Sequence, residues 1–465
     1  MHPLLARDLD SLPELLEEVR GYAAGVLGGL ADRPVTRPAV PSSSAASLPV
    51  EGAGTKGALD RFAERWEPGF SGSAGPRYLG FVTGGATPAS LAGDWLTGTF
   101  DQNPTSRADS AATELERETL GWLRGLFGLG EEHHGMFVSG ATMSNFTGLA
   151  IAREWLGERL GVSVTTDGVA ALGTVPVLSG AAHSSVGKAL SMLGLGRGAL
   201  RPVPLLPGRE AVDVGRLAEA LAALDGRPAI VVANAGTVNT VDFDDLRAVA
   251  ALKDRFPFWL HVDAAFGGFA ALSPRHAHLL EGLEAADSVC VDLHKWLNVP
   301  YDAAVQFTRR PDLQVAAFHN ASPYLGMPTG DPDPVHLTPE NSRRLRALAT
   351  WFTLAAYGRA GHREIVERNA AEASRLGEAL EAHPSFRLLA PVRLNVVCFT
   401  LAGAPAQERV DALLRHVAAS GEAFLTPTVY AGVPAVRAAF SNWRTTASDT
   451  ARVLAALDEA AASPA

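Results

Sequence analysis

Short apolar runs alternate with segments of helical periodicity along the middle of the chain, from about residue 79 to residue 350. Each run is followed by small or polar residues and then by a helical stretch. Continuous apolar strands that alternate with helices are typical of a mostly parallel sheet covered by helices on both faces. The middle of the chain is therefore predicted to be an α/β domain. Its clearest strands are residues 135–139, 174–179, 229–234, 258–263 and 288–292.

The two ends of the chain depart from this alternation. Residues 1–78 begin with an amphipathic helical stretch and continue through a segment rich in Pro, Ser and Gly. Such a segment cannot form a core of its own, so we expect it to wrap around another surface. Residues 351–465 combine a long helical stretch, strand-like sequence and a closing helix, which predict a smaller α+β domain. The expected organisation is an N-terminal helical arm, a large α/β domain at 79–350 and this small C-terminal domain.

Composition and charge exclude several classes of protein. With 465 residues, of which 47% are apolar, the chain can form two or three structural units around a substantial core. The net charge of −10 and the lack of a basic cluster argue against nucleic-acid or membrane partners. The two cysteines exclude a disulfide framework and a cysteine-rich metal site, and no metal is expected. Without a secretion signal or an apolar run of membrane-spanning length, the expected location is cytoplasmic.

Lys295 is one of only four lysines, against 36 arginines, and it follows the apolar run 288–292 almost directly. Asp263 ends the preceding run and lies 32 residues earlier, about one strand–helix–strand unit. Because the carboxyl ends of parallel strands meet at one edge of a sheet, we expect both side chains on the same rim. A lysine amine opposite a buried carboxylate suits pyridoxal 5′-phosphate (PLP). The lysine bonds to the aldehyde of PLP, and the carboxylate keeps its ring nitrogen protonated.

The stretch "SGATMSN" at 139–145 offers a site for the phosphate of this cofactor. It connects an apolar strand to a helical segment, and the free amides of a helix N-terminus favour an anion. The candidate donors are the amides of Ala141, Thr142 and Met143 and the hydroxyls of Thr142 and Ser144.

Three further residues can contact the ring or the substrate. His183, at the start of a helical segment, offers an imidazole that can stack on a pyridine ring, and Ala265 is small enough for the opposite face. Thr237 can donate to the cofactor or to the substrate carboxylate. Each of these residues alone also fits an ordinary structural role, such as a rim lysine, a turn aspartate or a helix-starting histidine. Their order and spacing together favour the cofactor site.

At these residues the sequence resembles the group II PLP-dependent decarboxylases, the family of aromatic-L-amino-acid and glutamate decarboxylases. The resemblance covers the chain from about residue 75 to its end, and its most specific part is the set "HSSV", "HVDAAF" and "HKW". It implies a fold type I homodimer whose active sites use residues from both subunits. It also implies that Lys295 bonds to PLP, that Asp263 holds the ring nitrogen and that His183 stacks on the ring.

The same resemblance implies roles for other positions. Thr142, Met143 and His294 are expected at the phosphate, and "GFVTG" at 80–84, with Phe81 and Thr83, is expected to line the substrate pocket. Asp292 is expected beside the phosphate, where the aromatic enzymes usually have asparagine.

One departure from the family concerns the outcome of the reaction. A mobile loop before the "SRR" stretch carries, in the family, a tyrosine that protonates the substrate after carbon dioxide leaves. Counting back from Arg343 places that position on Pro334. Tyr324 and His336 are the nearby candidates for the proton donor.

The leading hypothesis is α-decarboxylation of an L-amino acid to the amine. Aromatic residues at Phe81, Trp95, Phe100 and Tyr324 favour an apolar or aromatic substrate, although the same residues fit core packing or an interface. The missing loop tyrosine keeps two alternatives open, namely oxidative decarboxylation to an aldehyde with release of ammonia and peroxide, and a carbon–carbon lyase reaction. A PLP-binding protein without turnover and a dinucleotide-binding protein are weaker alternatives, the latter because no Gly-x-Gly-x-x-Gly motif follows a first strand.

Overall fold

A seven-stranded sheet forms the centre of the computed structural model, in the order β1–β7–β6–β5–β4–β2–β3. The structure describes residues 1–37, 47–320, 331–403 and 405–463. β7 runs antiparallel to both β1 and β6, and the remaining pairs are parallel, which confirms the predicted mostly parallel sheet. The strands are β1 His134–Val138, β2 Val177–Ser179, β3 Leu200–Pro202, β4 Ala229–Asn234, β5 Phe258–Asp263, β6 Ser288–Asp292 and β7 Ala304–Thr308.

Every residue of β4, β5 and β6 is buried, which explains why these strands read as continuous apolar runs. Their bounds agree with the predicted runs 229–234, 258–263 and 288–292. The sequence analysis did not predict β3 or β7. β3 has only three residues, all partly exposed, and β7 returns antiparallel after β6 with only a short helix and a turn between them.

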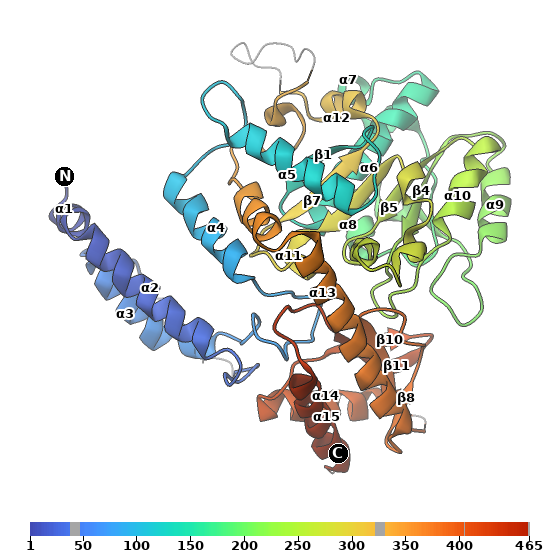
Figure 1. Ribbon diagram of the computed structural model, residues 1–465. Helices are drawn as coiled ribbons and strands as arrows, with labels where there is room; N and C mark the ends of the chain where they lie inside the picture. Colours follow the sequence, from blue (N-terminus) through green and yellow to red (C-terminus); the bar gives the residue numbers. More distant parts are fainter. Residues whose placement is uncertain (38–46, 321–330, 404, 464–465) are drawn as a thin grey trace.

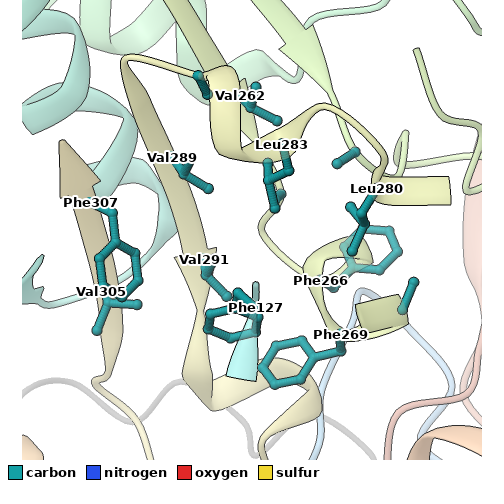
Figure 2. Close-up of a cluster of buried hydrophobic side chains, with 14 of the residues drawn as sticks. Phe127, Val262, Phe266, Phe269, Leu280, Leu283, Val289, Val291, Val305 and Phe307 are labelled. Atoms are coloured by element: carbon teal, nitrogen blue, oxygen red, sulfur yellow. The ribbon is translucent and has the colours of Figure 1, made fainter. Parts of the chain in front are cut away.

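Helices cover both faces of the sheet (Figure 1), and neighbouring residues of β4 face opposite sides of it. Ile230 and Val232 of β4 pack with α6 (Ala141–Leu160) and α8 (Ser184–Met192), whereas Val231 and Ala233 belong to the core on the other face. Figure 2 shows part of that second core, where Val262, Val289, Val291 and Val305 meet Phe127 and Phe269. The other helices of this region are α4 Pro88–Phe100, α5 Ala112–Leu126, α7 Val164–Asp167, α9 Val214–Ala222, α10 Leu246–Ala251, α11 Leu293–Trp296 and α12 Pro311–Phe318.

The C-terminal part forms a second, four-stranded antiparallel sheet in the order β10–β11–β9–β8. Helix α13 (Ala347–Ala382) runs from the large unit into this small unit, so the predicted boundary between residues 350 and 351 lies inside it (Figure 1). Its Val366 packs in the core of the large sheet, and its Leu376 packs in the small core. The remaining elements are β8 Phe386–Leu388, β9 Val396–Leu401, α14 Gln407–Ser420, β10 Thr426–Tyr430, β11 Val433–Ala439 and α15 Ala447–Ala462.

The chain around Leu79 is attached to this small unit, although it precedes the large sheet in sequence. The amide of Leu79 donates to the carbonyl of Phe424 at 2.9 Å, and the amide of Ala439 donates to the carbonyl of Leu79 at 2.9 Å. The Leu79 side chain packs within the core of the small unit. The segment 80–84, which follows directly, is therefore fixed by contacts with the last part of the chain.

The N-terminal helices extend away from the body of the molecule (Figure 1). They are α1 Pro3–Asp10, α2 Leu12–Gly28 and α3 Gly54–Arg65, and every residue in them remains at least partly exposed in the described chain. Apolar side chains stand in water here, since Leu5 is 64% exposed and Leu16 is 60% exposed. Helices therefore occupy the region where the sequence analysis expected an arm, and the wrapping of this arm around another surface stays a prediction.

We expect Glu116→Ala to destabilise the fold by about 3–5 kcal/mol, because it leaves the buried guanidinium of Arg343 without its carboxylate. Arg343 donates to the two carboxylate oxygens of Glu116 at 2.8 and 2.6 Å, and both side chains are 1% exposed. The free energy of unfolding in urea measures the effect. Glu114→Ala is the matched control on the same helix, because its ion pair with Arg117 is exposed and its removal should change stability by about 0.5 kcal/mol or less. Equal losses in the two variants would contradict the expectation.

Candidate active site

Lys295 lies on α11, a single helical turn that begins where β6 ends. Its Nζ atom is 3.4 Å from Asp292 Oδ2 and 5.7 Å from the centroid of the Phe266 ring. The segment 80–84 presses against its backbone, since a Cβ atom added at Gly84 would lie 1.8 Å from the Lys295 carbonyl oxygen. The lysine is thus held at the carboxyl edge of the sheet on a backbone that has little room to move.

Asp263 is the last residue of β5, and its carboxylate is almost fully enclosed at 7% exposure. Asn145 Nδ2 donates to its Oδ2 atom at 2.9 Å, and the amide of Ala265 donates to its Oδ1 atom at 3.1 Å. Burying a carboxylate is costly unless such donors replace water. Each oxygen therefore has a fixed donor and a lone pair left for a further one.

A cavity of about 240 Å³ brings Lys295 and Asp263 together. It also includes the predicted ring contacts His183 and Ala265, the phosphate-site residue Ala141, the predicted pocket residue Phe81, and Thr237 and His294. The remaining wall is mostly apolar or aromatic, with Val82, Phe266 and Tyr301 among its members. Residues that are up to 356 positions apart in the chain, from Phe81 to Arg437, thus share one site.

His183 stands at the N-cap of α8, and its ring is accessible from the cavity. Its Nδ1 atom accepts from the amide of Ser185 at 3.3 Å and lies 2.8 Å from the Ser185 hydroxyl. Desolvation lowers the pKa of His183 below its usual value, while the charge of Asp263 acts in the opposite direction. The ring is therefore neutral at pH 7, with Nδ1 as an acceptor.

The N-terminus of α6 lies beside the cavity, with Gly140 as its N-cap. The Ala141 amide donates to Asp292 Oδ2 at 3.3 Å, so this predicted phosphate donor already has a partner. The hydroxyl of Ser144, another predicted donor, is buried and donates to the Val305 carbonyl at 2.9 Å. The amides of Thr142 and Met143 belong to the first helical turn, where amides have no acceptor within the helix.

His294 and Asp292 lie next to one another at this end of the cavity. The Nδ1 atom of His294 is 3.1 Å from Asp292 Oδ1, and its ring lies against Tyr301 at 4.2 Å between centroids. Desolvation is the largest effect on His294 and lowers its pKa, and the neighbouring Asp292 opposes it. The Asp292 carboxylate is 2% exposed and places a negative charge beside the helix N-terminus.

Two predicted substrate or cofactor contacts make other hydrogen bonds. Thr237 lines the cavity, but its hydroxyl donates to Glu210 Oε2 at 2.7 Å. Thr83 is buried, and its hydroxyl lies 3.4 Å from the hydroxyl of Tyr301. Phe81 is 56% exposed at the rim, with a φ angle of 56° that is unusual for a residue with a side chain.

The structure describes only one of the two candidate proton donors, because Tyr324 falls outside the described residues. His336 is 3% exposed, stacks on His319 at 5.1 Å between ring centroids and accepts a hydrogen bond from the Asn320 amide. It is not among the residues that line the cavity. Pro334 begins a short 3₁₀ turn that ends at His336.

Arg437 is a cavity residue to which the sequence analysis assigned no role. It lies on β11 and donates to the carbonyls of Val238 at 2.8 Å and Phe81 at 3.4 Å. Its Nε atom is buried and has no hydrogen-bond partner among the described residues. Local spacing could not reveal this residue, because it lies 142 positions after Lys295 in a chain rich in arginine.

Asn145 and His261 were also missed, although both stand inside motifs that the sequence analysis quoted. His261 Nε2 lies 2.8 Å from Asn145 Oδ1, and both side chains are fully buried behind Asp263. Burial lowers the pKa of His261 to about 4.

The residues present fit PLP. A lysine amine, a buried carboxylate with free lone pairs, an imidazole and a small residue for the ring faces, and a helix N-terminus all border one cavity. A mostly parallel sheet that carries this set along its carboxyl edge defines the class of fold type I PLP-dependent enzymes.

Comparisons with known proteins agree with this assignment to the PLP-dependent enzymes. The profile of the pyridoxal-dependent decarboxylase conserved domain matches residues 60–402. The aromatic-L-amino-acid decarboxylase of Sus scrofa is 30% identical over 441 residues, which cover 88% of each chain. The L-2,4-diaminobutyrate decarboxylase of Acinetobacter baumannii is 28% identical over 361 residues, covering 73% of this chain and 69% of the relative. The crystal structure of Oryza sativa TDC with PLP and tryptamine has a TM-score of 0.90 at 24% identity and covers 97% of this chain and 98% of its own.

The chain therefore belongs to the pyridoxal-dependent decarboxylase family, as its motifs indicated. It is a PLP-dependent amino-acid decarboxylase, a carboxy-lyase. Among the described residues, no helix is long and apolar enough to cross a membrane.

The low pKa of His261 predicts a pH dependence of stability. The unfolded histidine binds a proton below about pH 6.5 and the folded one only below about pH 4, so stability is lost as the pH falls through this window. Between pH 7 and pH 5 the loss from this residue should be about 2 kcal/mol. The free energy of unfolding in urea is measured at pH 7 and pH 5 for wild type and for the non-titrating variant His261→Gln. The difference between the two proteins isolates the contribution of His261. An equally steep loss in the variant would rule out His261 as the source.

Proposed function

We propose that the protein removes the α-carboxylate of an L-amino acid with an apolar or aromatic side chain and releases the amine. The observation that carries this proposal is the single cavity that joins Lys295 and Asp263 to a wall of Phe81, Val82 and Tyr301. The first two residues provide the chemistry of decarboxylation. The wall offers an apolar surface to the substrate side chain.

Each residue of the site has a defined task in this proposal. The Lys295 amine would hold PLP through the aldehyde carbon of the cofactor. PLP supplies an electron sink for the bond to the departing carboxylate. Asp263 would keep a proton on the ring nitrogen, which would make that sink effective, and Asn145 and Ala265 donate hydrogen bonds to its oxygens. His183 would cover one face of the ring, and Ala265 would leave room on the other.

Arg437 supports the binding of an anionic group at the mouth of the cavity. Its guanidinium is held in place by the carbonyls of Val238 and Phe81, and its Nε atom keeps an unused donor among the described residues. Every amino-acid substrate carries a carboxylate that can accept a hydrogen bond from such a donor. The same bond to Phe81 ties the guanidinium to the rim that meets the substrate side chain.

The relatives differ in substrate, so the family alone does not choose one. The Sus scrofa relative is named for aromatic L-amino acids, whereas the Acinetobacter baumannii relative is named for L-2,4-diaminobutyrate. The apolar and aromatic wall supports the first kind of substrate. A diaminobutyrate side chain carries a second amine, and Arg437 places a positive charge in the cavity that disfavours it.

A second candidate outcome is oxidative decarboxylation to the aldehyde, with ammonia and peroxide as by-products. The sequence favours it, because counting back from Arg343 places Pro334 where, by the resemblance, the family has its proton-donating tyrosine. Proline has no acidic proton to give, so protonation depends on another group, for which Tyr324 and His336 are candidates. If protonation is slow, molecular oxygen can react first. A carbon–carbon lyase reaction remains a further alternative at the same site.

We further propose that the protein is a homodimer in the cytoplasm. The support for a dimer is the exposed apolar surface of the arm and of α4, where Leu9 is 59%, Leu16 is 60% and Phe100 is 63% exposed. Burying such surface against a second copy is favourable. The cytoplasmic location stays a prediction from the sequence.

The product can be identified by mixing PLP-loaded protein with each standard L-amino acid and measuring carbon dioxide, amine, aldehyde and peroxide together. We expect carbon dioxide and amine in equal amounts, with the fastest turnover for an apolar or aromatic substrate. Aldehyde and peroxide instead of amine would establish the second candidate. Lys295→Ala should lose turnover, while Lys188→Ala, which changes an exposed lysine on α8, should keep it. Wild-type activity in Lys295→Ala would overturn the assignment of the lysine.

The dimer can be tested by light scattering after size-exclusion chromatography. We expect a molar mass of twice the 48.7 kDa chain. The double change Leu9→Glu and Leu16→Glu should lower it towards that of one chain, because charges replace the apolar contacts. Leu48→Glu is the control, since Leu48 is 92% exposed outside the arm helices. A wild-type protein that elutes as a single chain would contradict the proposal.

A further inference from the structure

A chain of buried hydrogen bonds lies behind the cavity and ends on two of its residues. It starts at Trp259, whose Nε1 atom donates to the hydroxyl of Ser288 at 2.9 Å. The same hydroxyl is 2.8 Å from His261 Nδ1, and His261 Nε2 is 2.8 Å from Asn145 Oδ1. Three neighbouring elements, β5, β6 and α6, contribute these four side chains.

From Asn145 the hydrogen-bond chain divides towards the cavity. Its Nδ2 atom donates to Asp263 Oδ2 at 2.9 Å and to the hydroxyl of Ser185 at 3.0 Å. The Ser185 hydroxyl in turn lies 2.8 Å from His183 Nδ1. One branch therefore ends on the carboxylate and the other on the imidazole.

The direction of every bond follows from the groups involved. The indole of Trp259 can only donate, so the Ser288 hydroxyl accepts from it and gives its own proton to His261 Nδ1. A neutral His261 then carries its proton on Nε2 and donates to Asn145 Oδ1. With its oxygen used as an acceptor, the Asn145 amide presents both protons of Nδ2 towards the cavity side.

The same reasoning fixes the state of His183. Its Nδ1 atom already accepts from the backbone amide of Ser185, so it carries no proton when the ring is neutral. The Ser185 hydroxyl accepts from Asn145 and therefore donates to His183 Nδ1. The proton of the neutral ring then lies on Nε2.

The packing around His261 shows that the fold makes room for this imidazole. A Cβ atom added at Gly148 of α6 would lie 2.6 Å from His261 Cε1 and 2.7 Å from its Nδ1 atom. A glycine in a helix interior costs about 1 kcal/mol relative to alanine. His261, Asn145 and Ser288 are all fully buried, so a missing partner would leave a buried polar group unpaired.

We propose that Asn145 and His261 are positioning residues, which hold the Asp263 carboxylate in the orientation that receives the ring nitrogen of PLP and set the proton of His183 on Nε2. The proposal rests on the proposed contact between Asp263 and the ring nitrogen. It differs from a purely structural role in one respect. Loss of His261 or Asn145 should weaken specifically the contact that involves the ring nitrogen, and not binding of the phosphate or the aldehyde.

The test compares two ligands that differ at that one atom. The full-length protein is freed of cofactor and titrated with PLP or with its 1-deaza analogue, in which a CH group replaces the ring nitrogen. The analogue keeps the phosphate and the aldehyde but has no ring N–H for Asp263. We expect wild type to bind PLP about tenfold more tightly than the analogue, since hydrogen bonds to charged groups have this magnitude.

The variants His261→Leu and Asn145→Leu should bind PLP more weakly and bind the analogue nearly as well as wild type does. The ratio of the two affinities should therefore fall towards one. His261→Gln keeps a donor for Asn145 Oδ1 and should restore most of the preference. Thr308→Val is the matched control, because Thr308 is the β7 neighbour of Ser288 and its buried hydroxyl donates to the Asp287 carbonyl instead. It should keep the wild-type preference.

The possible failures are distinguishable. If wild type binds both ligands equally, Asp263 does not contact the ring nitrogen, and that part of the proposed function is wrong. If wild type prefers PLP and the two leucine variants keep that preference, the positioning role is overturned. Equal weakening of both ligands in the variants overturns it as well, because it indicates general damage to the cavity. Should one leucine variant fail to fold, Ser288→Ala removes the hydroxyl next to His261 and gives the same comparison.

Discussion

The rest of the site is arranged around the buried hydrogen bond that the Asn145 side chain donates to the Asp263 carboxylate, whose other oxygen accepts from the Ala265 amide. An ionised carboxylate at 7% exposure is tolerated only where fixed donors replace water. β5 brings Asp263 to the carboxyl edge of the sheet, and α6 brings Asn145 to meet it from the neighbouring face. The parallel arrangement of β5 and β6 then sets Lys295 on the same rim.

Helix α6 combines several functions within its first eight residues. Ala141 in its first turn lines the cavity, Asn145 reaches the Asp263 carboxylate, and Gly148 leaves space for His261. The hydroxyl of Ser144 anchors the same turn to β7 through the Val305 carbonyl. A change in the tilt of this helix would therefore move the anion site and the carboxylate together.

The sequence predicted those parts of the molecule that repeat a local pattern. The buried strands β4, β5 and β6 were found because a parallel sheet makes them uniformly apolar, and Lys295, Asp263 and His183 were found because each follows such a strand. Features that depend on long-range packing were missed. Arg437 enters the cavity from the other sheet, and His261 was taken as part of a strand. The hydroxyls of Ser144 and Thr237 were assigned to ligands because their buried partners, Val305 and Glu210, cannot be read from spacing.

The attachment of Leu79 to Phe424 and Ala439 has a consequence for the order in which the chain matures during synthesis. The seven strands of the large sheet are all present once residue 308 has been synthesised, and the part of its core that α13 supplies, including Val366, follows later. The rim at 80–84 and the guanidinium of Arg437 must wait until nearly the whole chain is available. A nascent or C-terminally truncated chain would thus carry Lys295 and Asp263 without the contacts that fix the rim at 80–84, so this part of the cavity is completed last.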